Sequence, residues 1–407
     1  MKAARFLDRS TPPHIVTLVL LAALSTLAMN IFLPSLPAMA RDFGVDYSVM
    51  QLSVSAYLAG SAVLQIVVGP ISDRYGRRPL ILAATTLFIL ASVAAALAPT
   101  AGLFLAARVV QAVIATGMAL SRAVIRDMVP TEQAASMIGY VTMAMSVVPM
   151  VGPAVGGFLD EVFGWRSTFV LLVVLGLLTL WLLWSDLGET SAPIGRSLRE
   201  QIAEYPALLR SPRFWGYAAT ASLASGSFYA YLGGAPFVGE RVFGLTPTEV
   251  GVYFAAPGLG YALGNFFAGR YSVRIGLDRM ACLGTLIATG VLLMGTIAAL
   301  IWPPHPMLFF PFVGLMAVGN GMTLPNANAG LLSVRPHLAG SASGLGGALT
   351  IGGGAALAAL SGPLMTEASG HLTLMGLMAA CSALSSLTMI LVIRRARRVG
   401  RLGQLGR

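Results

Sequence analysis

Arg108 is the residue whose type and position point most directly to chemistry. It begins the run Arg108-Val109-Val110-Gln111, inside an apolar segment at 102–121. About six residues separate it from the end of that segment, a depth of roughly 9 Å at 1.5 Å per residue. A buried charge is costly unless it finds partners, so its default interpretation is functional. A purely structural cation bonded to carbonyls is the alternative.

No acidic side chain is expected at the same depth. All 16 Asp and Glu residues fall in loops or at the ends of apolar segments. Asn30 lies about five residues from the end of the first apolar segment. We therefore expect it to share the depth of Arg108 and to form a hydrogen bond with it. An amide, however, cannot load and release a proton.

Other polar and aromatic side chains inside apolar segments could line a central cavity. Such a cleft has apolar walls and few convergent polar groups. The candidates are Asn30, Arg108, Gln111, Tyr229, Tyr231, Tyr253, Tyr261, Asn265, Asn320 and Asn326. Without a buried carboxylate, the cavity suits neutral or anionic amphipathic compounds better than strongly cationic ones. For each tyrosine and asparagine, packing between helices is the alternative role.

The composition indicates that these side chains lie within a membrane. Of the 407 residues, 10% are charged and 56% are hydrophobic, and the mean hydropathy is +0.79. A soluble domain carries about 25% charge, so a soluble enzyme, a nucleic-acid binder and a disordered chain are excluded. We expect a lipid bilayer around the chain, no nucleic-acid partner and no cofactor.

Cysteine and histidine indicate neither a disulfide framework nor a metal site. Cys282 and Cys381 lie in apolar stretches, and the 4 histidines are scattered near segment ends. A membrane-embedded enzyme needs intramembrane nucleophiles, acids or metal ligands. We therefore predict no catalytic residue, no metal and no enzyme activity. A signalling receptor is disfavoured because nothing outside the apolar segments is large enough for an effector domain.

Apolar runs of about 20 residues predict membrane-spanning helices. Twelve such segments are expected, at 15–35, 48–69, 79–98, 102–121, 134–157, 166–185, 214–236, 249–269, 280–301, 307–332, 338–362 and 371–393. Runs such as 171–175 (LLVVL) lack the alternation of a membrane barrel. The predicted fold class is therefore all-α and integral to the membrane.

The positions of lysine and arginine predict the orientation of these spans. If the amino terminus is cytoplasmic, most of the 26 cations lie on the cytoplasmic side, and the opposite loops hold Arg41, Arg166 and Arg241. This bias predicts an inner-membrane, multi-pass protein with both termini in the cytoplasm. A signal peptide cleaved after Ala40 is the alternative, but cleavage would leave an odd number of spans.

A polar segment divides the chain into two halves of six spans. The predicted parts are a cytoplasmic amino terminus (1–13), a six-helix bundle (14–185), a cytoplasmic linker (186–213), a second six-helix bundle (214–393) and a basic cytoplasmic tail (394–407). At an offset of 200, Arg74 and Gly76 match Arg274 and Gly276. Parallel repeats of this kind are typical of transporters with a central site. Chance matching among 46 glycines is the alternative.

A loop rich in glycine and arginine follows the second span, with the sequence GPISDRYGRRP at 69–79. It resembles the signature loop of the major facilitator superfamily. The resemblance implies a conformational latch against the eleventh span, formed by Gly69, Asp73, Arg74, Gly76, Arg77 and Arg78. In the second copy Val273 replaces the aspartate, so only the first half has the complete latch. A solvated basic turn is the alternative.

The fifth span contains the run PMVGPAVGG at 149–157. Two glycines four residues apart permit close helix contact, and the proline removes a backbone donor and bends the helix. The run resembles the antiporter motif of exporters in the superfamily. The resemblance implies a hinge made of Gly152, Pro153, Gly156 and Gly157. Ordinary small-residue packing is the alternative.

Further runs resemble the drug-resistance branch known as Bcr/CflA. They are MNIFLPSLP at 29–37, SFYAYLGGAPFV at 227–238, and PNANA at 325–329 followed by AGSASG at 339–344. That branch has an aspartate at the position of Asn30. The run Arg108-Val109-Val110-Gln111 resembles the superfamily's fourth-span signature, which has a glycine at the position of Ala112.

The resemblance implies a secondary active transporter that exports drug-like or amphipathic small molecules by alternating access. It also implies proton antiport driven by the proton gradient, against which Asn30 argues. An importer or facilitator of a small metabolite on the same fold is the alternative. We expect a small-molecule substrate and a monomer.

Overall fold

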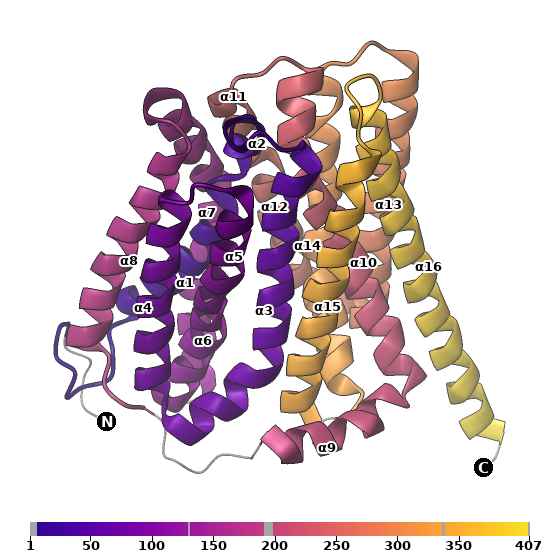
Figure 1. The fold of residues 1–407 in the computed structure, drawn as a ribbon. Helices are drawn as coiled ribbons and strands as arrows, with labels where there is room; N and C mark the ends of the chain where they lie inside the picture. Colours follow the sequence, from indigo (N-terminus) through magenta and orange to yellow (C-terminus); the bar gives the residue numbers. More distant parts are fainter. Residues whose placement is uncertain (1–5, 129–130, 191–197, 336–337, 406–407) are drawn as a thin grey trace. The chain divides into compact units, whose positions relative to one another are not determined.

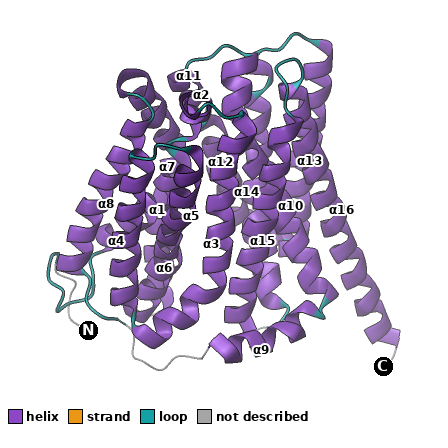
Figure 2. Cartoon of the chain, viewed as in Figure 1, coloured by secondary structure: helices purple, strands orange, loops and turns teal. Residues whose placement is uncertain are grey.

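The computed structural model describes residues 6–128, 131–190, 198–335 and 338–405. Helices joined by loops make up these ranges, and no strand occurs among them (Figure 2). The predicted all-α class is confirmed for the described residues.

Nine helical segments of the described residues are long and apolar enough to cross a membrane. They are Ile15–Phe43, Tyr47–Ser72, Arg77–Ala96, Ala101–Ile125, Arg166–Asp186, Leu277–Ile301, Pro306–Ser333, Gly340–Leu364 and Gly370–Arg397. Apolar helices in this number indicate a multi-pass membrane protein.

The chain divides into two compact units. Unit 1 comprises Met1–Gln201 and Gly244–Ala255, and unit 2 comprises Ile202–Phe243 and Ala256–Arg407. The predicted domain boundaries, which refer to a bilayer, remain a prediction.

Unit 1 contains the helices of the amino-terminal half and one short helix, α11, from later in the chain (Figure 1). They are α1 (Ile15–Asn30), η1 (Leu33–Ser35), α2 (Leu36–Phe43), α3 (Tyr47–Tyr75), α4 (Arg77–Ala96), α5 (Ala101–Gln111), η2 (Ala112–Ala115), α6 (Thr116–Met128), α7 (Thr131–Phe163), α8 (Arg166–Asp186) and the short α11 (Pro247–Tyr253). Within this unit α1 packs against α7, and α4 packs against α8.

The helices of unit 2 include a short segment before its first long helix. They are α9 (Leu198–Leu209), α10 (Pro212–Phe237), η3 (Val238–Val242), α12 (Ala255–Ile275), α13 (Leu277–Ile301), η4 (Pro306–Leu308), α14 (Phe310–Ser333), α15 (Ala339–Ser361), η6 (Gly362–Leu364) and α16 (Gly370–Leu405). The first residues of α9 and α12 belong to unit 1, and the rest of both helices to unit 2. Within unit 2, α10 packs against α15 and α16, and α13 packs against α14 and α16.

Local sequence signals set several helix starts. The Ser211 hydroxyl accepts the N–H of Phe214 at the start of α10, where a proline occupies the first helical position. At α11, Thr246 and Glu249 form a reciprocal capping box. These caps satisfy backbone donors that a helix end leaves free.

Several predicted spans are interrupted, among them the one expected at 15–35, where α1 ends at Asn30 and η1 follows. The segment expected at 102–121 consists of α5, a 3-10 turn (η2) and α6, and the segment expected at 249–269 consists of α11 and α12. The last of these breaks fits Pro257, which lacks an N–H and therefore cannot donate to the turn before it.

Candidate functional site

Arg108 lies in the interior of unit 1, on α5, with 0% of its surface exposed. Its Nη1 donates to the carbonyl of Ala28 at 3.1 Å and to Oε1 of Gln111 at 2.6 Å. Its Nε and Nη2 have no hydrogen-bond partner among the described residues. The guanidinium is therefore held inside the unit with two of its three nitrogens making no hydrogen bond to the described residues.

Two aromatic rings face the guanidinium of Arg108. Its Cζ lies 4.2 Å from the centroid of the Phe32 ring and 4.7 Å from that of Tyr57. The Tyr57 hydroxyl donates to the carbonyl of Ser25 at 3.2 Å, which fixes the second ring. A desolvated cation–π contact contributes about 2 kcal/mol. The two aromatic faces thus offset part of the free-energy cost of desolvating the guanidinium, a cost that a carboxylate partner usually offsets.

Gln111 connects the arginine to α4. Its Nε2 donates to the hydroxyl of Ser92 at 2.7 Å, which donates in turn to the carbonyl of Phe88 at 2.8 Å. The structure therefore brings two of the predicted cavity residues, Arg108 and Gln111, together. They belong to one chain of hydrogen bonds that joins α1, α5 and α4.

The predicted hydrogen bond between Asn30 and Arg108 is wrong. Asn30 is buried (3% exposed), but its Nδ2 donates to the carbonyl of Thr26 at 2.8 Å. Asn30 is the last residue of α1, so the carbonyl one turn back is the acceptor nearest to its amide. The arginine instead uses the carbonyl of Ala28 on the same helix.

The alanine that departs from the fourth-span signature fits its surroundings. Ala112 is buried (0% exposed), and a Cβ built on Gly60 would lie 2.9 Å from its methyl group. The glycine on α3 therefore makes room for the methyl on η2. This pairing keeps the close approach of two helices that a glycine at 112 would give.

The predicted latch loop is mostly helical. Helix α3 continues to Tyr75, so Gly69 lies inside it with open space around its Cα. The turn is made by Gly76 alone, at φ +93° and ψ 155°, a conformation open almost only to glycine. Asp73 lies in α3, and its side chain is outside the described part. The predicted contact of the latch with the eleventh span, expected at 338–362, likewise stays a prediction.

The arginines of the loop hold neighbouring helix ends. Arg77 pairs its Nε with Oδ2 of Asp127 on α6 at 3.1 Å and also donates to the Ser72 hydroxyl. Arg78 donates to the carbonyls of Leu187 at 2.7 Å and Trp184 at 3.3 Å, at the end of α8.

Arg74 differs from these two arginines. Its guanidinium lies over the exposed ring of Tyr75, 5.4 Å from the centroid. The described structure therefore supports a role in joining helices for Arg77 and Arg78, and a solvated role for Arg74.

Glu189 also contributes to this region, although the sequence did not predict its role. Its two carboxylate oxygens accept the first N–H groups of α4, those of Arg77 at 2.9 Å and Arg78 at 3.2 Å. A Cβ on Gly76 would overlap with this carboxylate. Negative charge at a helix amino terminus is favourable. In the sequence Glu189 is one acid of a polar segment, with no spacing that links it to α4.

The glycines of the predicted hinge face two different helices. A Cβ on Gly152 would touch the side chain of Leu27, and one on Gly156 would overlap with the carbonyl of Ile31, both beside α1. A Cβ on Gly157 would overlap with the carbonyl of Pro247 on α11. Helix α7 runs through Pro153 without a break. These positions act as a packing seam in the structure, and the hinge role remains a prediction.

The candidate asparagines of unit 2 are engaged with backbone carbonyls. Asn265 donates to Tyr261 at 3.0 Å and Asn326 to Met322 at 2.7 Å, each one turn back on its own helix. Asn320 donates to Ala224 of α10 at 3.1 Å and so joins α14 to α10. Packing therefore explains these amides without a ligand.

The candidate tyrosines fall into separate settings. Tyr231 is fully buried and stacks on Phe309, with 6.4 Å between ring centroids, so it belongs to the core of unit 2. Tyr229 and Tyr261 are partly exposed on α10 and α12. Tyr253 ends α11 in unit 1.

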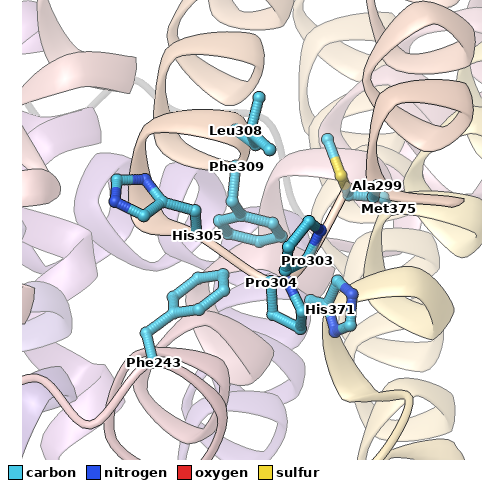
Figure 3. A pocket seen from close by; sticks show the side chains of 9 residues that line it. All are labelled: Phe243, Ala299, Pro303, Pro304, His305, Leu308, Phe309, His371 and Met375. Carbon is cyan, nitrogen blue, oxygen red and sulfur yellow. The ribbon is translucent and has the colours of Figure 1, made fainter. Parts of the chain in front are cut away.

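Unit 2 contains a small cavity and an open groove. The cavity has a volume of about 10 Å³, room for about one water molecule. Figure 3 shows its lining, in which the rings of His305 and His371 point away from each other. Among the described residues no three His, Cys, Asp or Glu side chains gather as a metal site. The groove, between α10 and α15, has about 300 Å³ and includes Trp215 and Leu349 in its lining.

The sequence profile of the Major Facilitator Superfamily matches residues 18–359 and, in a second match, 240–405. Multidrug resistance protein D of Escherichia coli (strain K12) is 30% identical over 376 residues, which are 89% of this chain and 93% of that protein. The bicyclomycin resistance protein homolog of Haemophilus influenzae is 27% identical over 383 residues, 91% of this chain and 94% of that protein.

A solved structure of the same fold is that of a D-xylose-proton symporter. It superposes with a TM-score of 0.74 at 16% identity, covering 92% of this chain and 96% of the other. At this identity the likeness concerns the fold alone.

Proposed function

The chain belongs to the major facilitator superfamily, and we propose that it works there as a secondary active exporter of drug-like or amphipathic small molecules. The family resemblance inferred from the motifs is confirmed, and the chain is a transporter rather than an enzyme. The observation that carries the proposal is that two relatives named for drug resistance align with about nine-tenths of the chain.

The proposed architecture is twelve spans in two six-helix bundles that give alternating access to one central site. The chain lies in the inner membrane as a monomer, with both termini in the cytoplasm. The positive-inside pattern of lysine and arginine supports this orientation. The grouping of the described helices into two compact units supports the division into bundles.

The proposed substrates are neutral or anionic. Arg108 supports this choice, because its described partners are two neutral oxygens and two aromatic rings. A strongly cationic substrate would meet a like charge there without a balancing carboxylate.

The proposed driving force is the proton gradient, with no bound cofactor. The proton carrier is a group other than Asn30, because an amide does not titrate.

A growth screen tests the proposed function. Cells that overexpress the chain should resist a neutral compound such as chloramphenicol, and a protonophore should abolish that resistance. Resistance to the permanent cation tetraphenylphosphonium should be much weaker. In everted vesicles, drug accumulation that depends on the proton gradient is expected. Flux in the opposite direction would favour an importer and contradict export.

A further inference from the structure

The amino-terminal segment folds back onto a buried carboxylate at the end of α8. Asp186 is the last residue of α8 and, among the described side chains, the only buried carboxylate. Its Oδ1 accepts the N–H of Leu7 at 2.9 Å. Its Oδ2 accepts the N–H of His14 at 2.8 Å and the hydroxyl of Thr17 at 2.6 Å. Three neutral donors from one stretch of chain thus surround this negative charge.

Residues 6–14, here named the strap, have a defined local structure. The side chain of Asp8 accepts the N–H and the hydroxyl of Ser10 at 3.0 and 2.6 Å. The carbonyl of Asp8 accepts the N–H and the hydroxyl of Thr11 at 3.0 and 2.8 Å. Thr11 is buried (8% exposed), although the strap is short and polar. The strap is therefore a folded element.

The strap also fits closely over the chain beyond α8. A Cβ on Gly188 would overlap with the carbonyl of Arg9, so the absence of a side chain there lets the strap approach. Asp186 supplies the acceptor and Gly188 the space, two residues apart. The two features together specify the docked position of the strap.

The physical consequence is that the strap and the start of α1 are held together against the end of α8. A buried charge is tolerated only while hydrogen bonds replace its lost hydration. If the strap left, Asp186 would keep only the bond from Thr17. The positive end of the α1 dipole adds to this attraction, so the beginning of α1 is held against the end of α8.

We propose that Asp186 is a positioning residue, which through the strap and Thr17 fixes α1 within unit 1. Helix α1 has 16 residues and a length of about 24 Å. Near its other end, Ala28 accepts the bond from Arg108. A displacement at the start of a rigid helix is passed to its end, so release of the strap should disturb the surroundings of Asn30 and Arg108. The consequence for transport rests on the proposed function.

Cysteine labelling of the full-length protein in detergent tests docking at the strap. Native Cys282 and Cys381 are first replaced by alanine. Thr11→Cys then reports a buried strap position, and Ser10→Cys, on the exposed side, is the matched control. Adding Asp186→Asn should raise the maleimide labelling rate of Thr11→Cys about tenfold, because it removes charge-assisted hydrogen bonds. It should leave Ser10→Cys unchanged. An unchanged rate at Thr11→Cys would overturn the proposal.

The same measurement at the far end of α1 separates positioning from simple docking. Asn30→Cys should also label faster when Asp186→Asn is added. If only the strap position responds, Asp186 anchors the strap without positioning α1, and the proposal fails. Should Asp186→Asn not fold, Thr17→Val removes one of the three bonds and keeps the carboxylate. It should speed both labels about threefold, and no change would overturn the proposal.

Transport gives an independent readout in proteoliposomes with chloramphenicol as the probe. Asp186→Asn and Thr17→Val should lower the maximal rate several-fold and leave KM within about twofold. A normal maximal rate in a variant with faster labelling at both positions would overturn the role in transport. If the unmodified chain fails to move the drug, the proposed function is contradicted, and the two labelling results still decide whether Asp186 positions α1.

Discussion

The two units use the same kind of tie between helices with different side chains. In unit 1 Arg108 of α5 donates to a backbone carbonyl of α1, and in unit 2 Asn320 of α14 donates to a backbone carbonyl of α10, both at 3.1 Å. Asn320 is neutral, with its second contact to the sulfur of Met316. Arg108 carries a charge, and its Nε and Nη2 have no hydrogen-bond partner among the described residues. The helix contact is thus common to both units, and in the described structure the buried guanidinium belongs to unit 1 alone.

The loops after α3 and α12 show the same contrast. Gly76 and Gly276 share nearly one backbone conformation, with φ +93° and +91°. Glu189 fills the space beside Gly76, whereas among the described residues none beyond the chain neighbours lies within 4 Å of a Cβ built on Gly276. The two turns therefore have the same shape, and among the described residues a carboxylate distant in sequence lies beside the first turn alone.

The largest expected effect comes from changing Arg108, the charged donor of the helix contact in unit 1. Arg108→Lys should lower chloramphenicol transport in proteoliposomes at least tenfold, because an ammonium group lacks the planar, delocalised charge that lies close to the two rings. Asn320→Ala should mainly lower the free energy of unfolding, by about 1–3 kcal/mol. Equal losses of transport in the two variants would contradict the contrast between the units.

A new carboxylate in each unit gives the next test. Asn30 and Asn326 both bond one turn back and are 3% and 2% exposed. Asn30→Asp enters a unit whose arginine has unused N–H groups, so it should fold and make transport more dependent on the proton gradient. Asn326→Asp should lower stability by several kcal/mol, because an unpaired buried charge is costly. Flux assays at two pH values measure the first effect, and an unchanged pH response would remove Asn30 as the site of a lost proton carrier.

A smaller effect is expected at the two turns. Gly276→Ala should destabilise by about 1–3 kcal/mol through its backbone alone. Gly76→Ala should cost more, because a methyl group would also displace Glu189 from the start of α4. Thermal unfolding in detergent compares the two variants. If Gly276→Ala were the more damaging, the anchoring role of Glu189 would be wrong.

The smallest effect concerns Glu161, at the end of α7 and past the predicted span 134–157. The N–H of Thr248 donates to its carboxylate at 3.0 Å and lowers the pKa of that carboxyl below its usual 4.5. A lowered folded pKa stabilises the protein at neutral pH, and this contribution is lost as the pH falls through that pKa. Glu161→Gln should therefore lower the Tm slightly at pH 7 and not in strong acid. Glu367→Gln, at an exposed ion pair with Arg241, should change the Tm at neither pH.

Much of the fold could be predicted because its signals are local. Apolar length, the distribution of arginine and the motif at 69–79 require no knowledge of distant contacts. The burial of Arg108 was equally predictable, since a charge within an apolar segment stands out by itself. Its bond to Gln111 joins residues three apart on one helix, but spacing alone does not say which acceptor an arginine takes.

The rest depended on which helices meet. Asn30 bonds within its own helix instead of reaching Arg108, and the flanking rings of Phe32 and Tyr57 come from parts of the chain about 50 to 75 residues away. Asp186 and Glu189 looked like ordinary acids of a polar linker, because their donors lie more than 100 residues earlier.

The sequence by itself determined that this chain is helical, crosses a membrane and belongs to a transporter superfamily, because hydropathy and short motifs are properties of contiguous residues. Only the tertiary structure decided how its buried charges are satisfied. A carboxylate or guanidinium takes whatever donors, acceptors and rings the packing brings within about 3 to 5 Å, and no spacing along the chain encodes that choice.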